Sequence, residues 1–172
     1  MNNKDSGIDQ TQYLTFHLAG EEYAVDILQV REIITYGTLT KVPHTPASIR
    51  GVINLRGNVV PVVDLGIKFG LTPSPVTDRT CIVIVEANIN ESRTVMGIIA
   101  DSVSQVISMS EDNILPAPAF GTRVRIDFLR GMGQSGDKFV LVLEIDKVLS
   151  AEDLRPMAPG GGAEEPGPAG AL

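Results

Sequence analysis

The chain has 172 residues, of which 43% are hydrophobic, 20% charged and 5% aromatic, with a formal net charge of −7 and no tryptophan. This much apolar material can build a core, which excludes a wholly disordered chain, and the length excludes a large multidomain assembly. No basic region is present to neutralise phosphates, so the composition argues against nucleic-acid binding.

Both ends of the chain differ in composition from the middle. The segment from Pro156 to Gly170 holds four of the 11 prolines and five of the 17 glycines, which predicts a disordered tail over residues 151–172. Residues 1–10 are polar and are expected to be flexible. No run approaches the roughly 18 apolar residues of a membrane span, so we expect a folded cytoplasmic domain over residues 11–150 without membrane insertion.

Strand-like runs dominate this middle part. Leu14, Phe16 and Leu18 alternate with Thr15 and His17, which predicts a half-buried strand. The Gly57-Asn58 pair suits a tight hairpin turn, and Pro61 predicts an edge or irregular strand. The other expected strands are 23–25, 52–55, 59–63, 81–85, 95–100 and 139–145, and short helical signals occur at 27–30, 47–49, 65–69 and 146–149. The fold class is therefore mainly β with short helices.

An internal repeat divides the middle part into two related β modules of roughly 70 residues. Ile49-Arg50-Gly51-Val52 recurs as Leu129-Arg130-Gly131-Met132, and the run 59–65 recurs at 139–145 with the same offset. Upstream, Val30-Arg31-Glu32-Ile33 matches Val103-Ser104-Gln105-Val106, and Val42-Pro43 matches Leu115-Pro116. Modules of this size are marginally stable alone, so we expect each to bury apolar surface against the other.

Side chains with catalytic or metal-binding chemistry are scarce. Cys81 is the one cysteine, and neither His17 nor His44 has a partner at metal-ligand spacing, so we expect no metal and no cofactor. The duplicated acids Asp64 and Glu144 leave an alternative open, a small-molecule-binding or hydrolytic double barrel. The competing interpretation is that each acid ends a strand and caps a short helix.

Charged residues within apolar segments point instead to contacts with partners. Arg50, Arg56 and Glu32 lie in such segments, where unpaired charges are costly. A pair between Glu32 and Arg56 would remove this cost, although both side chains could also face solvent. Aliphatic residues exceed what two small cores need, so we expect a groove between the modules that accepts an amphipathic helix. Burial in a core is the competing interpretation, and for any single residue it is the stronger one. The candidates are Val30, Ile33, Ile34, Val95, Val103 and Val106.

Several motifs resemble the CheW family of chemotaxis coupling proteins. They include Val30-Arg31-Glu32-Ile33, the run Ile49-Arg50-Gly51-Val52-Ile53-Asn54-Leu55-Arg56-Gly57, and Gly97-Ile98-Ile99-Ala100-Asp101. The closing run Leu141-Val142-Leu143-Glu144-Ile145-Asp146 is also similar, and the resemblance covers about residues 11–150. It implies two SH3-like five-stranded β-barrels packed around a shared apolar interface.

The resemblance also implies a function and partners. It implies a non-enzymatic adaptor in two-component signalling that couples the cytoplasmic tips of methyl-accepting chemoreceptors to the regulatory domain of the histidine kinase CheA. Such an adaptor is cytoplasmic and reaches membrane receptor arrays through its partners. The 22 residues after Ser150 have no room for a receiver or kinase domain, so a free-standing coupler is expected.

Binding residues follow from the motifs position by position. Val30, Glu32 and Ile33 match family positions tied to binding and signalling, as do Gly51 and Arg56. The resemblance further implies that Val95 and Val103 line the receptor groove, and that Phe120 lies at a kinase contact.

Overall fold

The computed structural model describes residues 10–72, 74–116 and 126–148. Within these ranges the chain is mainly β, with ten strands in two five-stranded sheets that each curl as a half-barrel, and this confirms the predicted fold class. No helix in the described part of the chain is long and apolar enough to cross a membrane. The expected flexible N-terminus, the tail and Phe120 lie outside the described residues.

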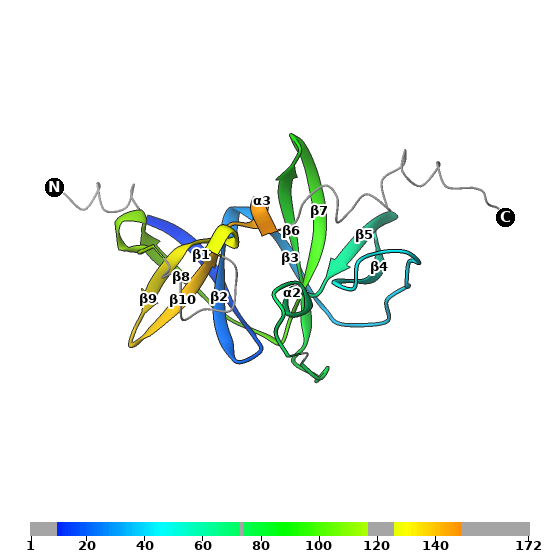
Figure 1. Cartoon of the computed structure of the whole chain (residues 1–172), viewed down its shortest axis with the longest axis horizontal. Helices are drawn as coiled ribbons and strands as arrows, with labels where there is room; N and C mark the ends of the chain where they lie inside the picture. Colours follow the sequence, from blue (N-terminus) through cyan, green and yellow to red (C-terminus); the bar gives the residue numbers. More distant parts are fainter. Residues whose placement is uncertain (1–9, 73, 117–125, 149–172) are drawn as a thin grey trace.

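Two lobes lie side by side along the longest axis of the molecule (Figure 1). We call one the central lobe, because its strands follow one another in the middle of the chain. Its strand order is β3-β6-β7-β5-β4, with β3 (Val30–Thr35), β4 (Ile49–Leu55), β5 (Asn58–Val63), β6 (Cys81–Ile89) and β7 (Ser92–Ala100). It also contains helix α2 (Leu65–Lys68).

The other lobe, here the terminal lobe, is built from the two ends of the described chain. Its strand order is β8-β1-β2-β10-β9, with β1 (Gln10–Leu18), β2 (Glu21–Asp26), β8 (Ser102–Ser110), β9 (Leu129–Ser135) and β10 (Lys138–Leu143). The chain enters the central lobe through the 3-10 turn η1 (Ile27–Gln29). The terminal lobe also holds the turns η2 (Glu111–Asn113) and η3 (Ile126–Phe128) and helix α3 (Ile145–Val148).

The repeat in the sequence corresponds to equivalent strands in the two lobes. Strands β3, β4 and β5 of the central lobe correspond to β8, β9 and β10 of the terminal lobe. The hairpin β6–β7 corresponds to β1–β2, which precedes the rest of its lobe in the chain. The two modules are therefore interleaved, because the first hairpin of the chain completes the second lobe.

Three local expectations were wrong. The residues with positive φ in the β4–β5 turn are Arg56 and Gly57, at 53° and 89°, whereas Asn58 already begins β5. Pro61 lies in an inner strand, and its missing N–H is tolerated because the parallel pairing of β5 with β7 involves only Val62 and Val63. The helical signal at 47–49 fails because β4 begins at Ile49.

The largest apolar cluster lies between the lobes and not inside either one. It joins Leu14, Phe16 and Leu18 of β1 to residues of β5, β6, β7 and α2 in the central lobe. Each lobe has a smaller cluster within its own curled sheet, around Tyr13 in the terminal lobe and around Ile82 in the central lobe. Because β1 is covered on both faces, Thr15 is buried, although its alternation with apolar residues predicts a polar surface position.

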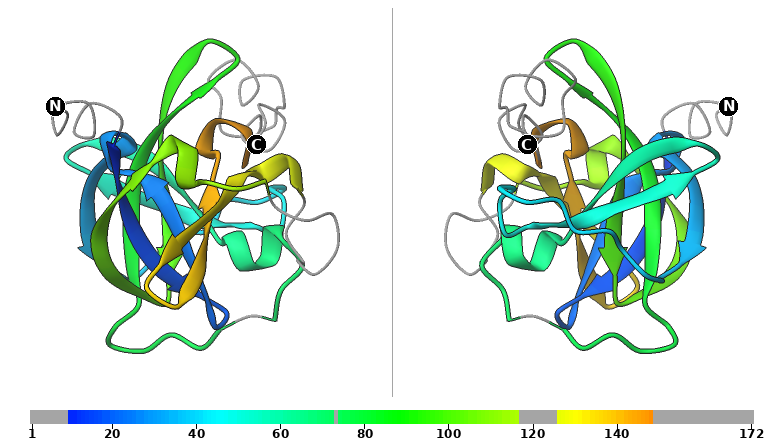
Figure 2. Two further views of the ribbon diagram at one scale, coloured as in Figure 1. Left: turned by 90° about the vertical axis from the view of Figure 1, so that its left-hand side faces the viewer. Right: turned by 90° about the vertical axis from the view of Figure 1, so that its right-hand side faces the viewer.

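A row of aromatic rings crosses the boundary between the lobes. Phe16 and Tyr23 of the terminal lobe have ring centroids 6.1 Å apart, and Tyr23 lies 6.2 Å from Phe69 at the end of α2. Phe69 in turn stacks on Phe128 of the terminal lobe at 5.5 Å. Figure 2 looks along the long axis of the molecule, so the strands of the two lobes overlap in both of its views. Ring contacts across this boundary help to hold the lobes together.

Tyr23 connects this interface to a measurable pH dependence. Burial, with a smaller contribution from the carboxylate of Glu21, raises the pKa of Tyr23 to about 12. The unfolded chain ionises this phenol near its ordinary pKa of 10.0, so the free energy of unfolding is undiminished below that pH and falls as pH rises toward 12. Burial raises the pKa of Tyr13 as well.

We therefore expect the midpoint of thermal unfolding to fall steeply above pH 10 and to fall less in Tyr23→Phe, because that variant has no phenol to ionise at the interface. Calorimetry or circular dichroism over this pH range measures the difference. Tyr36→Phe is the control and should show the full decrease, since it leaves Tyr23 in place. An equal decrease in the parent and in Tyr23→Phe would contradict this account.

Candidate functional site

An ion pair links strand β3 to the β4–β5 turn at the edge of the central lobe. Arg56 donates two hydrogen bonds to Glu32, one from Nη2 to Oε1 at 2.9 Å and the other from Nη1 to Oε2. The bidentate contact lowers the pKa of the Glu32 carboxyl and raises that of the Arg56 guanidinium. The Arg56 side chain is 71% exposed, whereas Glu32 is 28% exposed. The predicted pair is therefore confirmed, and it presents a fixed guanidinium to solvent.

Among the residues that the structure describes, the terminal lobe has no counterpart of this pair. The repeat aligns Gln105 with Glu32 and Gly136 with Arg56. The backbone N–H and C=O of Gln105 bond to the Thr15 hydroxyl, and Gly136 occupies the β9–β10 turn with a φ of 63°. The ion pair therefore marks one lobe of an otherwise repeated structure.

Aliphatic side chains occupy equivalent places on the edge strands β3 and β8. Val30 of β3 and Val103 of β8 are half-buried, and both pack against the apolar cluster between the lobes. Three residues further along the same strands, Ile33 and Val106 are 43% and 49% exposed. We call these residues the aliphatic rows: one row is Val30 and Ile33 on β3, and the other is Val103 and Val106 on β8.

The pairing register explains why the rows are continuous with the core between the lobes. Val103 lies opposite Phe16, and Val106 lies opposite Leu14, both of which belong to that core. On β3, Val30 and Ile33 lie opposite Val85 and Val83, which belong to it as well. Each edge strand therefore extends the apolar face of its sheet from the buried core to the surface, and does so in both lobes.

The remaining predicted binding residues lie elsewhere. Val95 of β7 is half-buried and packs on the inner cluster of the central lobe, together with Ile34, so it does not share the face of Val30 and Val103. Gly51 lies in β4 and is buried.

Gly51 has a packing role that requires the absence of a side chain. A Cβ at this position would lie 2.6 Å from the carbonyl oxygen of Thr40, and φ is +153°. The segment at Thr40 crosses β4 here through two backbone hydrogen bonds to Val52. Gly131 of the terminal lobe repeats this, with the carbonyl of Leu115 in the same role. The two glycines let a crossing segment close one end of each curled sheet.

The duplicated carboxylates each pair with their own arginine. Arg50 donates to Asp64 Oδ2 at 2.8 Å, and the other oxygen of Asp64 accepts the N–H of Ile67 and so caps α2. Arg130 donates to both oxygens of Glu144, at 3.1 and 3.4 Å. The capping interpretation is confirmed for Asp64, whereas the Glu144 side chain binds Arg130.

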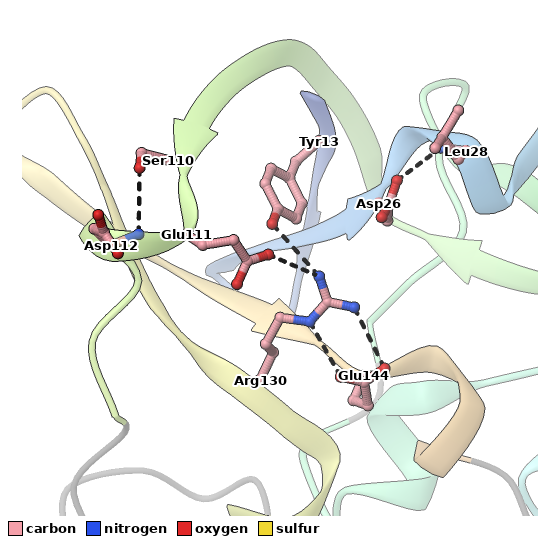
Figure 3. Close-up of polar contacts among 8 residues, drawn as sticks. All are labelled: Tyr13, Asp26, Leu28, Ser110, Glu111, Asp112, Arg130 and Glu144. Atoms are coloured by element: carbon pink, nitrogen blue, oxygen red, sulfur yellow. Dashed lines mark hydrogen bonds and ion pairs between the residues drawn. The ribbon is translucent and has the colours of Figure 1, made fainter. Parts of the chain in front are cut away.

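Figure 3 shows Arg130 at the centre of the network in the terminal lobe. The hydroxyl of Tyr13 lies 3.5 Å from Arg130 Nη1, and Glu111 adds a weaker ion pair at 3.8 Å. The carboxylate of Glu144 raises the pKa of Arg130 above its ordinary value. Because both acids are engaged by arginines in equivalent places, nothing in this geometry supports a hydrolytic pair.

Residues suited to metal binding do not gather in the described part of the chain. Among residues 10–72, 74–116 and 126–148, no three His, Cys, Asp or Glu side chains could hold a metal ion together. Cys81 is half-buried at the start of β6, and burial raises the pKa of its thiol. A thiol in this state is a weak nucleophile.

The sequence analysis did not single out an exposed apolar residue that is repeated beside two equivalent turns. Val59 and Phe139 are each the second residue of the strand that follows the β4–β5 or the β9–β10 turn, and they are 72% and 52% exposed. Strands β4 and β5 lie on one side of the molecule in Figure 1, and β9 and β10 lie on the opposite side. An apolar residue repeated beside each turn was the signal that could have identified them.

Comparisons with known proteins agree on one family. Residues 12–153 match the CheW-like domain. The chemotaxis protein CheW of Klebsiella aerogenes is 37% identical over 143 residues, which cover 83% of this chain and 84% of that protein. The chemotaxis protein CheW of Treponema pallidum is 30% identical over 152 residues, covering 87% and 88%.

A solved structure is similar as well. The scaffolding protein TtCheW from Thermoanaerobacter tengcongensis superposes with a TM-score of 0.74 at 33% sequence identity, covering 83% of this chain and 90% of that protein. The likeness extends over both lobes of the fold.

Gly51→Ala tests the close approach of the crossing segment. We expect the free energy of unfolding to fall by about 2 kcal/mol, because the added Cβ forces the Thr40 segment away from β4. Gly37→Ala is the control, because a Cβ at Gly37 meets no atom within 4 Å. In this variant the free energy of unfolding should change by less than about 1 kcal/mol. Urea denaturation measures both, and equal stability of the two variants would contradict the packing role.

Proposed function

The chain belongs to the CheW family and is a chemotaxis scaffold protein, and from this premise we propose that it couples methyl-accepting chemoreceptors to the histidine kinase CheA. In this proposal the chain is not an enzyme. It acts in the cytoplasm and reaches membrane receptor arrays only through its partners. The receptor contact is made by the cytoplasmic receptor tip, and the kinase contact by the regulatory domain of CheA.

The aliphatic rows are the observation that carries the receptor contact. A helical hairpin presents apolar residues at i, i+3 and i+4 along each helix and needs an apolar surface to cover them. The rows supply such a surface on both lobes, next to a core that is already packed. Ile33 and Val106 are the members that a partner would bury most, because they are the most exposed.

The Glu32–Arg56 pair supports orientation of that partner. Arg56 is largely exposed and Glu32 holds its guanidinium in place, so the five donors of the guanidinium are only partly used. A guanidinium fixed by the edge strand that carries one row can bond to a carboxylate or carbonyl on the partner helix. Gly51 contributes by keeping β4 close to its crossing segment. The turn that carries Arg56 directly follows β4.

For the kinase we propose the two turns at opposite sides of the molecule. Val59 and Phe139 are exposed apolar residues beside these turns, and such residues become buried in protein interfaces. The two lobes present different residues at these turns, so each side can bind a different surface of the regulatory domain of CheA. Phe120 stays a predicted kinase contact outside the described residues, and Val95 stays a predicted groove residue, although its packing is within the central lobe.

Reconstitution with receptor tips and CheA tests the pair between Glu32 and Arg56. Arg56→Ala should weaken assembly about tenfold or more, because it removes one partner of a charged pair at the interface. Its thermal midpoint should match that of the parent, since the side chain is mostly exposed. Co-sedimentation with receptor-containing vesicles and CheA measures assembly.

Two further variants sharpen this test. Arg79→Ala removes an equal charge from an exposed position away from the pair and should leave assembly unchanged. The double exchange Glu32→Arg with Arg56→Glu rebuilds the ion pair with reversed polarity. If the double variant assembled like the parent, Arg56 would act only by bridging to Glu32 and not by contacting the partner.

The aliphatic rows generate a separate prediction. Ile33→Asn and Val106→Asn should each lower affinity for a receptor-tip helical hairpin about tenfold, since each removes roughly one buried aliphatic side chain from the contact. Isothermal titration calorimetry measures the affinity. Val59→Asn is the control, since Val59 is also an exposed aliphatic residue but lies beside the β4–β5 turn, and it should keep hairpin binding. Equal loss in all three variants would contradict the assignment of the rows to the receptor.

A further inference from the structure

Two aspartates bridge the lobes in the described part of the chain. Asp101 lies where the chain passes from one lobe to the other, and Asp146 bonds to Gln29, which lies at the other crossing. The first, Asp101, lies between β7 of the central lobe and β8 of the terminal lobe. Its carboxylate Oδ2 accepts the N–H of Ala19 in the terminal lobe at 2.9 Å and the hydroxyl of Ser74 in the central lobe at 2.8 Å. Its own N–H donates to the carbonyl of His17 at 2.9 Å.

The second, Asp146, is in helix α3 of the terminal lobe. Its Oδ1 accepts the N–H of Asn88 in β6 of the central lobe at 2.9 Å and the side-chain amide of Gln29 at 3.1 Å. The same amide donates to the carbonyl of Glu86 at 3.3 Å. Gln29 belongs to η1, where the chain passes from the terminal to the central lobe.

These aspartates lie next to the starts of the two edge strands. Val30 directly follows Gln29, the residue that Asp146 binds. Val103 is two residues after Asp101. Each bridge therefore holds the first residue of one aliphatic row relative to the opposite lobe. Both carboxylates are half-buried, and hydrogen bonds to a carboxylate are stronger than those between neutral groups.

We propose that Asp101 and Asp146 are positioning residues that fix the separation of the edge strands β3 and β8, so that a helical hairpin meets both aliphatic rows at a preset spacing. The apolar core between the lobes favours contact but is non-directional, so it tolerates sliding and rocking. Two directional bridges at the two crossings remove that freedom. The consequence for binding rests on the function proposed above, whereas the effect on the lobes does not.

The expected effect on affinity for the helical hairpin follows from the fraction of molecules whose lobes have the binding-competent arrangement. A lobe arrangement that is populated only part of the time lowers the apparent affinity by that fraction. If losing both bridges reduces the competent arrangement to about one tenth, hairpin affinity falls about tenfold.

Distance measurements on the full chain test the inference. Spin labels are placed at Asn58→Cys and Lys138→Cys, equivalent exposed positions of the two lobes, in a Cys81→Ala background. Pulsed electron resonance should give one narrow distance distribution in the parent. Asp146→Ala should broaden it, and Asp101→Ala with Asp146→Ala should broaden it further. Asp146→Asn keeps an acceptor oxygen and should stay narrow, as should the neighbouring control Lys147→Ala.

Unlabelled versions of these variants are then titrated with a synthetic helical hairpin that carries a receptor-tip sequence. Broadened distances with about tenfold weaker binding would support the inference. Unchanged distances in a folded double variant would overturn it, as would broadened distances with unchanged affinity. If the double variant fails to fold by circular dichroism, Asp146→Ala alone decides. A parent that does not bind the hairpin would refute the proposed function, while the distance distributions still decide whether the bridges fix the lobes.

Discussion

Burial of apolar surface between the lobes is the constraint on which the rest of the molecule depends. A five-stranded sheet that curls on itself encloses only a small cluster, such as the one around Tyr13, and modules of this size are marginal alone. The faces of β1, β6 and β7 that turn away from these small clusters bury one another instead. The lobes therefore cannot separate without exposing the largest core of the protein.

The repeat separates features that serve the fold from features that serve function. The arginine–carboxylate pairs and the crossings at Gly51 and Gly131 occur in both lobes, as expected for devices that each curled sheet needs to close. In the described ranges, the Glu32–Arg56 pair has no equivalent in the terminal lobe. A device that one lobe lacks cannot be required for folding such a lobe, so its presence in the other points to a partner.

The sequence predicts seven of the ten described strands, because alternation and turn residues act over short distances, but it misses β3, β8 and β9. The Glu32–Arg56 pair was also predictable, since unpaired charges among apolar residues are costly. The predictions for Thr15 and Pro61 failed because they depend on the order of the strands in the sheets. Thr15 is buried because a second layer covers β1, and Pro61 lies in an inner strand because pairing with β7 stops short of it. The bridges of Asp101 and Asp146 join segments up to 117 residues apart, as between Gln29 and Asp146, so no local pattern reveals them.

The aliphatic rows of the two lobes are nearly equivalent, so they do not by themselves determine the orientation of a bound partner. Two lobes with equivalent rows would accept an elongated partner in two opposite orientations related by the repeat. Charge breaks this equivalence: residues 27–101 hold seven basic and six acidic residues, a net +1, whereas residues 10–26 and 102–148 together hold five basic and nine acidic residues, a net −4. A partner with unequal charge along its length is favoured in one direction, because like charges placed opposite each other are costly. Arg56, whose guanidinium is largely exposed, belongs to the segment with net positive charge, so a contact with it in the proposed complex would favour the same direction.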